Sequence, residues 1–355
     1  AANRIATLAG VEVAEQLVSM TVTVALLSFW GKSDPARSCQ CIVLGSSAGG
    51  TLMLLMLIVF RIREEAPPAA RIPVCRRLCH AALPLAAGDV LRSGINTLEN
   101  LMVPRRLGLY GGVSDPLASF GRVSGMVFPV LMFPSAILSS LAEVLIPELA
   151  RCAAVGSRNR IRYLVRRNLR AALVYGLCCG GLLFLLSDPL CARLYPGEDI
   201  APLLRRFAVL MPMLYCDLLA DAMTKGLGQQ AACARYSIIS NVLDVGLMYF
   251  LLPRYGIEGY FVSFALTHAV NFGLSLRKVL SIGGVRVSGA FPALTVAAAV
   301  FAAFGGSCFG GAVQRTAAFL GLFFGSCFYT GALGRGDARW LRGLLSGCKI
   351  SRKMA

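Results

Sequence analysis

The sequence predicts an all-α protein that crosses a membrane about ten times, and two observations lead to that prediction. Of its 355 residues, 56% are hydrophobic and 15% are charged, with a mean hydropathy of +0.67, whereas a soluble domain is about 45–50% apolar and about 25% charged. The apolar residues also gather in runs of roughly 20, the length that a helix needs to cross a hydrocarbon core of about 30 Å. No segment between these runs is suited to a soluble domain.

Each apolar run is expected to form one spanning helix, with short polar loops between them. The runs cover residues 5–29, 42–60, 80–103, 118–147, 166–187, 203–224, 233–252, 258–276, 289–305 and 315–333.

Prolines and glycines add detail to this prediction. The run 118–147 contains Pro129, Pro134 and Pro147, and proline kinks a helix because it lacks the backbone N–H. Small residues four apart let two helices approach closely. Such pairs predict close packing at Gly121 and Gly125, at Gly176 and Gly180, and at Gly321 and Gly325.

The net charge of +17 comes from lysines and arginines that lie between the apolar runs. This placement is typical of loops on a membrane protein and not of a basic face that binds nucleic acid. With the N-terminus inside, the inside loops carry more than twice as many Lys and Arg residues as the outside loops. The bias predicts that both termini are cytoplasmic.

The stretch LRSGINTLENLMVPRRL, residues 91–107, places polar residues inside a predicted spanning helix. Arg92, Asn96, Glu99 and Asn100 are spaced i, i+4, i+7 and i+8, so they share one stripe of the helix. Ionisable residues at such depth usually serve function, which makes these four candidates for lining a substrate cavity. The alternative is an internal Arg–Glu pair that fixes helix packing. Arg92 and Glu99, however, lie about 10 Å apart along the axis, so each needs a partner elsewhere.

A second stripe consists of Asp217, Asp221 and Lys225, spaced i, i+4 and i+8. Lys225 is expected to pair with Asp221, which leaves Asp217 without a partner. A buried carboxylate without a partner is a candidate proton or sodium site. The alternative is a ladder of salt bridges at a helix end. His268, which lies near Asn271 in the sequence, is interpreted as a packing residue with satisfied hydrogen bonds.

No feature of the sequence indicates an enzyme, a metal centre or a bound cofactor. The thirteen cysteines form no C-x-x-C spacing with histidine partners, and we interpret them as small buried hydrophobic residues. There is no phosphate-binding G-x-x-x-x-G-K-[ST] loop and no nucleophilic triad. Energy for transport would come from an H⁺ or Na⁺ gradient, from the membrane potential or from the substrate's own gradient.

Several stretches resemble the stage V sporulation protein B group of polysaccharide and lipid-linked oligosaccharide flippases, within the multidrug/oligosaccharidyl-lipid/polysaccharide exporter superfamily. They are LRSGINTLENLMVPRRLGLYG, FPVLMFPSAILSSLAEVLIPELA, DAMTKGLGQQ and LLPRYGIEGY, and the likeness extends from about residue 4 to residue 333.

The resemblance implies a remnant of a two-bundle, V-shaped transporter fold. Residues 1–65 would be the last two helices of the N-terminal bundle, 75–280 a complete six-helix C-terminal bundle, 285–335 two extra helices, and 336–355 a basic cytoplasmic tail. It also implies that four helices precede these, so that the stretch alone is a fragment. Because alternating access needs both bundles, the activity of the fragment alone is in question.

The function that the resemblance implies is secondary-type flipping of a lipid-linked oligosaccharide or a cell-wall precursor, including spore cortex peptidoglycan. Arg92, Asn96 and Glu99 would line the cavity, with Arg92 facing phosphate oxygens. Membrane lipids and cell-wall synthesis proteins are the implied partners, and the bacterial cytoplasmic membrane is the implied location. Two alternatives stay open: a cation-coupled multidrug exporter with an acidic cavity, and a scaffold in spore cell-wall synthesis that does not transport.

Overall fold

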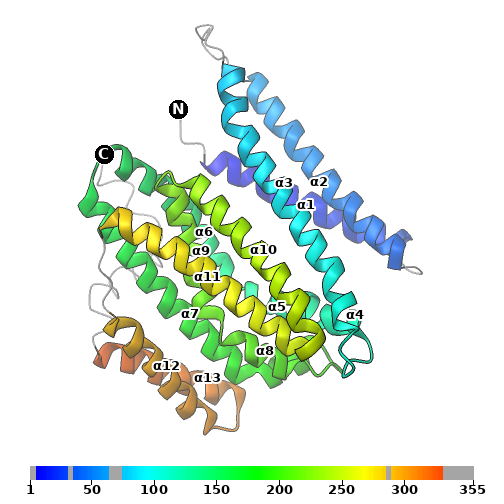
Figure 1. The fold of residues 1–355 in the computed structure, drawn as a ribbon, viewed down its shortest axis with the longest axis vertical. Helices are drawn as coiled ribbons and strands as arrows, with labels where there is room; N and C mark the ends of the chain where they lie inside the picture. The colour runs from blue at the N-terminus through cyan, green and yellow to red at the C-terminus, as the bar shows by residue number, and fades with distance from the viewer. Residues whose placement is uncertain (1–4, 31–34, 64–73, 285–288, 331–355) are drawn as a thin grey trace. The chain divides into compact units, whose positions relative to one another are not determined.

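A computed structural model describes residues 5–30, 35–63, 74–284 and 289–330 (Figure 1). Every regular element in those ranges is helical, which confirms the predicted all-α class. Five of the described helices are long and apolar enough to span a bilayer, and two bent helix pairs raise that number to seven. The other three predicted spans also form helices, but polar residues such as Glu99, His268 and Gln314 lower their apolar character.

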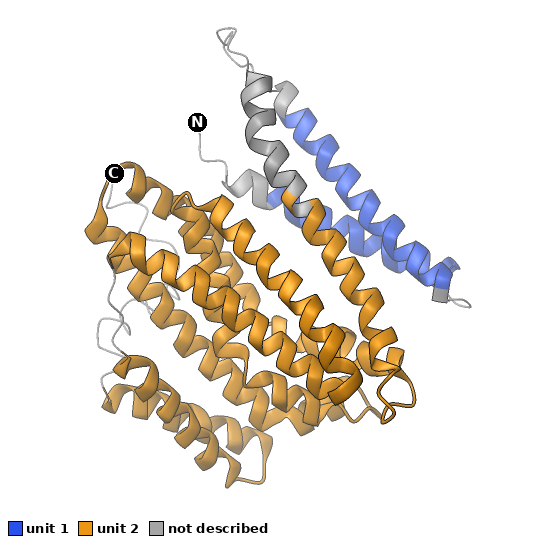
Figure 2. Ribbon diagram, in the orientation of Figure 1, with its two compact units in different colours: residues 1–80 blue, residues 81–355 orange. Residues whose placement is uncertain are grey.

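The chain divides into two compact units, Ala1–His80 and Ala81–Ala355 (Figure 2). The domain boundaries expected from the resemblance remain a prediction, and the proposed tail at 336–355 lies outside the described residues. In the first unit, helix α1 (Ile5–Trp30) packs against α2 (Pro35–Arg63). Gly45 and Gly49 face Thr23 and Ser19 so closely that a Cβ on either would overlap its neighbour. These glycines were not singled out from the sequence, although they also lie four residues apart.

The second unit contains the rest of the described helices. They are α3 (Val74–Leu107, from residue 81 on), α4 (Pro116–Gly121), the π-helix η1 (Arg122–Val127), α5 (Phe128–Met132), α6 (Ser135–Ala154), α7 (Arg158–Leu194), α8 (Ala201–Ala208), α9 (Met211–Gly226), α10 (Gln230–Tyr255), α11 (Ile257–Gly283), α12 (Ala290–Ser307) and α13 (Ala312–Tyr329). Helix α9 is the centre of the packing, because α6, α7, α10 and α11 all contact it.

Two of the predicted spans are bent. The span that ends in α6 turns by 61° between Met132 and Ser135, at Pro134, which confirms the kink expected from proline. The span formed by α8 and α9 turns by 51° just before Pro212. Breaks of this kind leave backbone carbonyls without their helical partners, and such groups need other donors inside a membrane.

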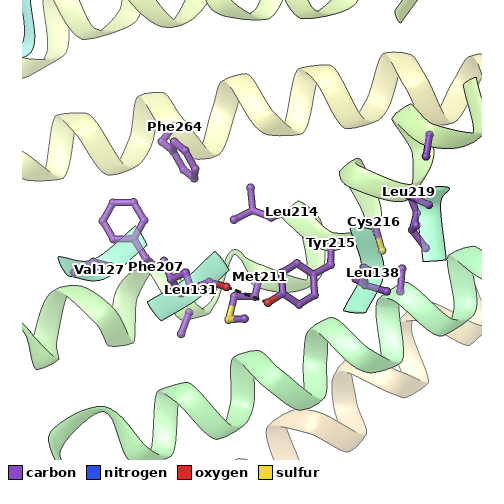
Figure 3. Packing of buried hydrophobic residues seen from close by; sticks show 14 of the residues in the cluster. Val127, Leu131, Leu138, Phe207, Met211, Leu214, Tyr215, Cys216, Leu219 and Phe264 are labelled. Carbon is purple, nitrogen blue, oxygen red and sulfur yellow. Dashed lines mark hydrogen bonds between the residues drawn. The ribbon is translucent and has the colours of Figure 1, made fainter. Parts of the chain in front are cut away.

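Two tyrosines supply donors at the break near Pro134. The hydroxyl of Tyr215 on α9 donates to the carbonyl oxygen of Leu131 at 3.0 Å, and the hydroxyl of Tyr175 on α7 donates to that of Pro134 at 2.8 Å. Figure 3 shows the first of these bonds within the buried apolar cluster. The two rings stack with their centroids 5.7 Å apart. The tyrosines therefore tie the bend to two neighbouring helices.

Close helix packing occurs at one of the three predicted glycine pairs. A Cβ on Gly176 would lie 2.7 Å from Cα of Pro212, and one on Gly180 would lie 2.7 Å from the carbonyl oxygen of Ala208. These two glycines let α7 contact the break between α8 and α9. The prediction is wrong for Gly121 with Gly125 and for Gly321 with Gly325, because no neighbouring atom among the described residues lies within 4 Å of their Cβ positions.

Helix α7 is the longest described helix, with 37 residues. Its C-terminal half packs against α12 and α13, where Phe319 and Phe323 stack in a smaller apolar cluster of their own. Its N-terminal half carries a run of arginines.

Candidate functional site

A polar cavity of about 570 Å³ lies among four helices of the second unit. Its lining consists of polar side chains from α3 (Arg92, Ser93, Asn96, Glu99), α9 (Asp217, Asp221), α10 (Ser237, Ser240, Asn241, Asp244) and α11 (Thr267, His268, Asn271). The two stripes that the sequence identified on separate helices therefore meet in one cavity. Polar side chains inside a helical membrane bundle typically line a path for a substrate or an ion.

Arg92 projects into this cavity from α3. Its Nε donates to Oγ of Ser237 on α10 at 3.2 Å, and a terminal guanidinium nitrogen contacts the same hydroxyl. Among the described residues no carboxylate forms an ion pair with Arg92. A neutral hydroxyl thus positions the guanidinium but leaves its positive charge available to an anion.

Helices α9 and α11 are joined by a network around two carboxylates. Nδ2 of Asn271 donates to Oδ1 of Asp217 at 2.8 Å and lies 3.4 Å from Oδ2 of Asp221. Ser275 donates to the other oxygen of Asp221 at 2.6 Å. Nδ1 of His268 lies 3.1 Å from Oδ2 of Asp217. Because of these contacts, each oxygen of the two carboxylates has one partner on α11.

A third carboxylate, Asp244 on α10, accepts a hydrogen bond from Ser263 of α11 at 2.7 Å. Glu99 of α3 lines the same cavity and is half-buried. None of the described hydrogen bonds or ion pairs involves its carboxylate. Glu99 therefore depends on water or on a bound ligand for its partner.

The charges of the cavity do not balance. Four carboxylates, Asp217, Asp221, Asp244 and Glu99, face one guanidinium and one imidazole. Charged groups are costly in a membrane unless they are paired or solvated. This excess of negative charge must be compensated by water, by protons or by bound cations.

Most of the candidate residues predicted from the sequence reach the cavity. Arg92, Asn96, Glu99, Asp217 and Asp221 line it, whereas Asn100 and Lys225 do not. Both of the latter are exposed elsewhere on their helices.

Two expectations about the second stripe are wrong. Lys225 forms no ion pair with Asp221 among the described residues, because Ser275 and Asn271 of the neighbouring helix satisfy that carboxylate. Asp217 is not without a partner, since Asn271 and His268 contact it. His268 belongs to the site and does more than pack.

Sequence reasoning missed the hydroxyl groups of the site. Ser263, Thr267, Asn271 and Ser275 recur every four residues along α11 and so share one face. That spacing was visible, but serine and threonine are common in membrane helices, where they often bond to their own backbone. Thr267 does so here, with Oγ1 donating to the carbonyl oxygen of Ser263 at 2.9 Å.

The described residues include no group of three or more His, Cys, Asp or Glu side chains placed to hold a metal ion.

A second hollow, an apolar groove of about 850 Å³, is lined by a different face of α9 and α11. Helices α7, α8 and α12 complete it, and Arg166 and Arg170 are its charged lining residues. The guanidinium of Arg170 lies 4.6 Å from the ring centroid of Phe291, in a cation–π contact.

An all-helical membrane bundle that contains broken helices and a polar cavity is typical of a multi-pass transporter. The family comparison agrees, because the family "Lipid II flippase MurJ" matches residues 10–325. The chain belongs to this family, which consists of transporters and not of enzymes. It is a multi-pass protein of the cytoplasmic membrane.

Two individual proteins illustrate the likeness. Stage V sporulation protein B of Bacillus subtilis (strain 168) is 24% identical over 165 residues, which cover 45% of this chain and 32% of that protein. The match thus spans about a third of the length of that curated relative. A solved structure, "Lipid II flippase MurJ, inward closed conformation", aligns with 90% of this chain and 67% of its own, at 13% identity and a TM-score of 0.63. The structural match supports the fold.

Proposed function

We propose that this chain takes part in flipping a lipid-linked oligosaccharide or cell-wall precursor across the cytoplasmic membrane. The observation that carries the proposal is Arg92, a cation on the wall of a polar cavity that is positioned by Ser237 and paired with no carboxylate among the described residues. Lipid-linked glycans carry phosphate groups, and a planar guanidinium with several donors binds phosphate oxygens well. The family membership supports the same class of substrate.

The mechanism we propose is alternating access, with the cavity open to one face of the membrane at a time. The bend before Pro212 supports this proposal, because it lies in the span that continues into α9 of the cavity wall, and broken helices beside a cavity are common in transporters that rock. We place both termini on the cytoplasmic side, in accord with the distribution of Lys and Arg over the loops. Cell-wall synthesis enzymes that make or use the precursor are the partners of this proposal.

The test is a flipping assay in proteoliposomes with a fluorescent lipid-linked oligosaccharide. The chain is expressed from the longest reading frame that contains it, so that any further helices are present. Arg92→Ala is expected to lower the flipping rate at least about tenfold, because a hydrogen bond to a charged group is worth about 1.5–3 kcal/mol. Arg92→Lys, which keeps the charge but not the planar donors, is expected to recover only part of that loss.

Arg106→Ala is the matched control, because Arg106 lies on the same helix but stacks over the ring of Tyr249 outside the cavity. It should flip lipid at the unaltered rate. Unchanged flipping by Arg92→Ala, in protein that inserts and folds normally, would remove Arg92 from the proposal.

A second candidate function is cation-coupled export of cationic drugs, and the excess of carboxylates in the cavity favours it. An acidic cavity attracts cations, and such export would require Asp217 and not Arg92. Efflux of cationic dyes from cells therefore separates the two functions: drug export predicts loss in Asp217→Asn and no change in Arg92→Ala.

A further inference from the structure

The apolar groove carries its charges at one end. Among its described lining residues, Arg166 and Arg170 on α7 are charged, whereas the others are Leu, Val, Ala, Gly, Pro, Met, Cys and Phe. Both arginines belong to the N-terminal half of α7, and Phe291 and Pro292 in the first turn of α12 complete that end of the groove. Positive charge at one end and hydrocarbon along the rest match an amphiphile with an anionic head group and apolar chains.

The apolar part of the groove is open at the surface of the bundle. Val209 and Val300 line it and are each 64% exposed. Val296 lines it as well and is exposed too. Within the described part of the chain, no helix covers these side chains. In a membrane protein, lipid chains can therefore reach the groove from the side.

We propose that this groove binds one anionic phospholipid of the cytoplasmic leaflet, with its phosphate at Arg166 and Arg170 and its acyl chains along α7, α11 and α12. This binding does not depend on the proposed flippase function. Basic pockets between membrane helices on the cytoplasmic side bind anionic head groups in other proteins. The topology that we propose from the distribution of Lys and Arg puts this end of α7 on that side.

Arg170 is held in position at the end of the groove. Its guanidinium lies 4.6 Å from the ring centroid of Phe291, so the contact joins α7 to α12. Among the described residues, no carboxylate forms an ion pair with Arg170. A neutral ring thus orients the guanidinium and leaves its charge and its donors to a phosphate. Arg166, one turn earlier on α7, adds a second cation on the same face.

The length of the groove matches one leaflet of a bilayer. Along α12 its lining residues run from Phe291 to Ala303, which is about 18 Å at about 1.5 Å per residue. One leaflet contributes about half of a hydrocarbon core of about 30 Å. A lipid whose phosphate lies at the arginines can therefore keep its acyl chains against apolar residues through the whole depth of its leaflet.

The lining also distinguishes a phospholipid from a lipid-linked glycan. A glycan needs hydroxyl, amide or carboxylate partners, and the described lining of the groove includes no such side chain. The polar cavity, which other faces of α9 and α11 line, provides all three. The lack of a carboxylate also disfavours a zwitterionic head group, because its ammonium group would meet the two arginines without a counter-charge. The groove therefore fits a head group with net negative charge.

The head-group site is tested by native mass spectrometry of the protein, expressed from the longest reading frame that contains this chain. It is titrated in detergent with dioleoyl phosphatidylglycerol and, separately, with dioleoyl phosphatidylcholine. The anionic lipid is expected to bind roughly 25-fold more tightly, because each arginine near an anionic head group contributes about fivefold. Arg166→Gln with Arg170→Gln should abolish this preference and leave the binding of phosphatidylcholine unaltered.

Arg158→Gln with Arg162→Gln is the control for the charge, since it removes two arginines from the same helix outside the groove lining. It should keep the preference for phosphatidylglycerol. Equal binding of the two lipids by the unaltered protein would overturn the site, and so would a preference that persists without Arg166 and Arg170.

The acyl-chain part of the site is tested by filling it. Val300→Trp leaves both arginines in place and should weaken the binding of both lipids. Phe301→Trp should not, because Phe301 is the next residue on α12, is 58% exposed and does not line the groove. If the double glutamine variant fails to fold, Val300→Trp decides the question, and unchanged binding of phosphatidylglycerol overturns the site.

A third titration separates the phospholipid from the carrier of the proposed substrate. Polyprenyl phosphate without a glycan is added to the complex with phosphatidylglycerol. The phospholipid is expected to stay bound at equal concentrations of the two lipids. Its displacement there would assign the groove to the polyprenyl carrier and overturn the proposal.

Discussion

The polar cavity and the apolar groove are lined by different faces of the same two helices, α9 and α11. On α9, Cys216 faces the groove and Asp217 the cavity; on α11, Phe272 faces the groove and Asn271 the cavity. Adjacent residues thus belong to two chemically opposite hollows. Helices α9 and α11 therefore form one wall, which can contact a polar ligand in the cavity and apolar chains in the groove.

The contrast also explains why the two hollows differed in how easily they were predicted. Ionisable residues in an apolar run stand out, so Arg92, Glu99 and Asp217 were recognised from sequence. Val296, Ala299 and Ala303 line the groove, yet they look like any membrane helix. A membrane helix that faces lipid and one that faces an apolar groove have the same composition.

The strongest way to break the wall is to push α7 away from it. Adding a methyl group at both Gly176 and Gly180 places each Cβ 2.7 Å from backbone atoms of Pro212 and Ala208. Overpacking costs typically about 1–3 kcal/mol at each site, so the double alanine variant should have a clearly lower melting temperature in detergent. Both hollows should be disturbed, because both border α9.

Gly321→Ala with Gly325→Ala is the control for that variant, since no described neighbour lies within 4 Å of either Cβ position. Equal melting temperatures for the two double variants would show that the contact between α7 and α9 accommodates the added methyl groups.

A smaller change weakens the wall without adding bulk. Tyr215 lies next to Cys216 and Asp217, and its hydroxyl donates to the carbonyl of Leu131 at the bend (Figure 3). Tyr215→Phe leaves that carbonyl without a donor, which should cost about 1–3 kcal/mol. Thermal unfolding followed by fluorescence measures the loss, with the exposed Tyr329→Phe as its control. A shift no larger than that of the control would mean that water replaces the hydroxyl.

The smallest expected effect on stability comes from filling the groove alone. Val296 is 44% exposed and lines the groove, so Val296→Trp should change the free energy of unfolding by no more than about 0.5 kcal/mol. It should reduce the lipid that co-purifies with the protein, measured by mass spectrometry. An unchanged amount of co-purified lipid would contradict a role of the groove in holding apolar chains.

The fold was largely predictable from sequence, because a run of about 20 apolar residues has few alternatives to a spanning helix. The ten predicted runs correspond to described helices or bent helix pairs. The bend at Pro134 was foreseen from the proline, whereas the bend before Pro212 was missed, although Pro212 gives the same signal within the run 203–224.

The site was predictable only within single helices. Spacing along α3 correctly grouped Arg92, Asn96 and Glu99, since one helix fixes their shared face. The pairing of Lys225 with Asp221 was wrong, because spacing on α9 says nothing about donors on α11. Ser275 reaches Asp221 from that neighbouring helix. Contacts between helices depend on the packing, and the packing depends on small residues such as Gly176 whose partners a single sequence does not reveal.

The length of α7 limits how this bundle can move. At about 1.5 Å per residue, its 37 residues extend roughly 55 Å, well beyond a hydrocarbon core of about 30 Å. The part that projects matches its arginine-rich N-terminal half, which holds Arg158, Arg160, Arg162, Arg166, Arg167 and Arg170. Drawing these residues toward the membrane centre would cost about 2.5–3.5 kcal/mol for each arginine. We therefore expect α7 to keep a constant depth in the membrane, which favours pivoting at the two bends over sliding of α7 along its axis.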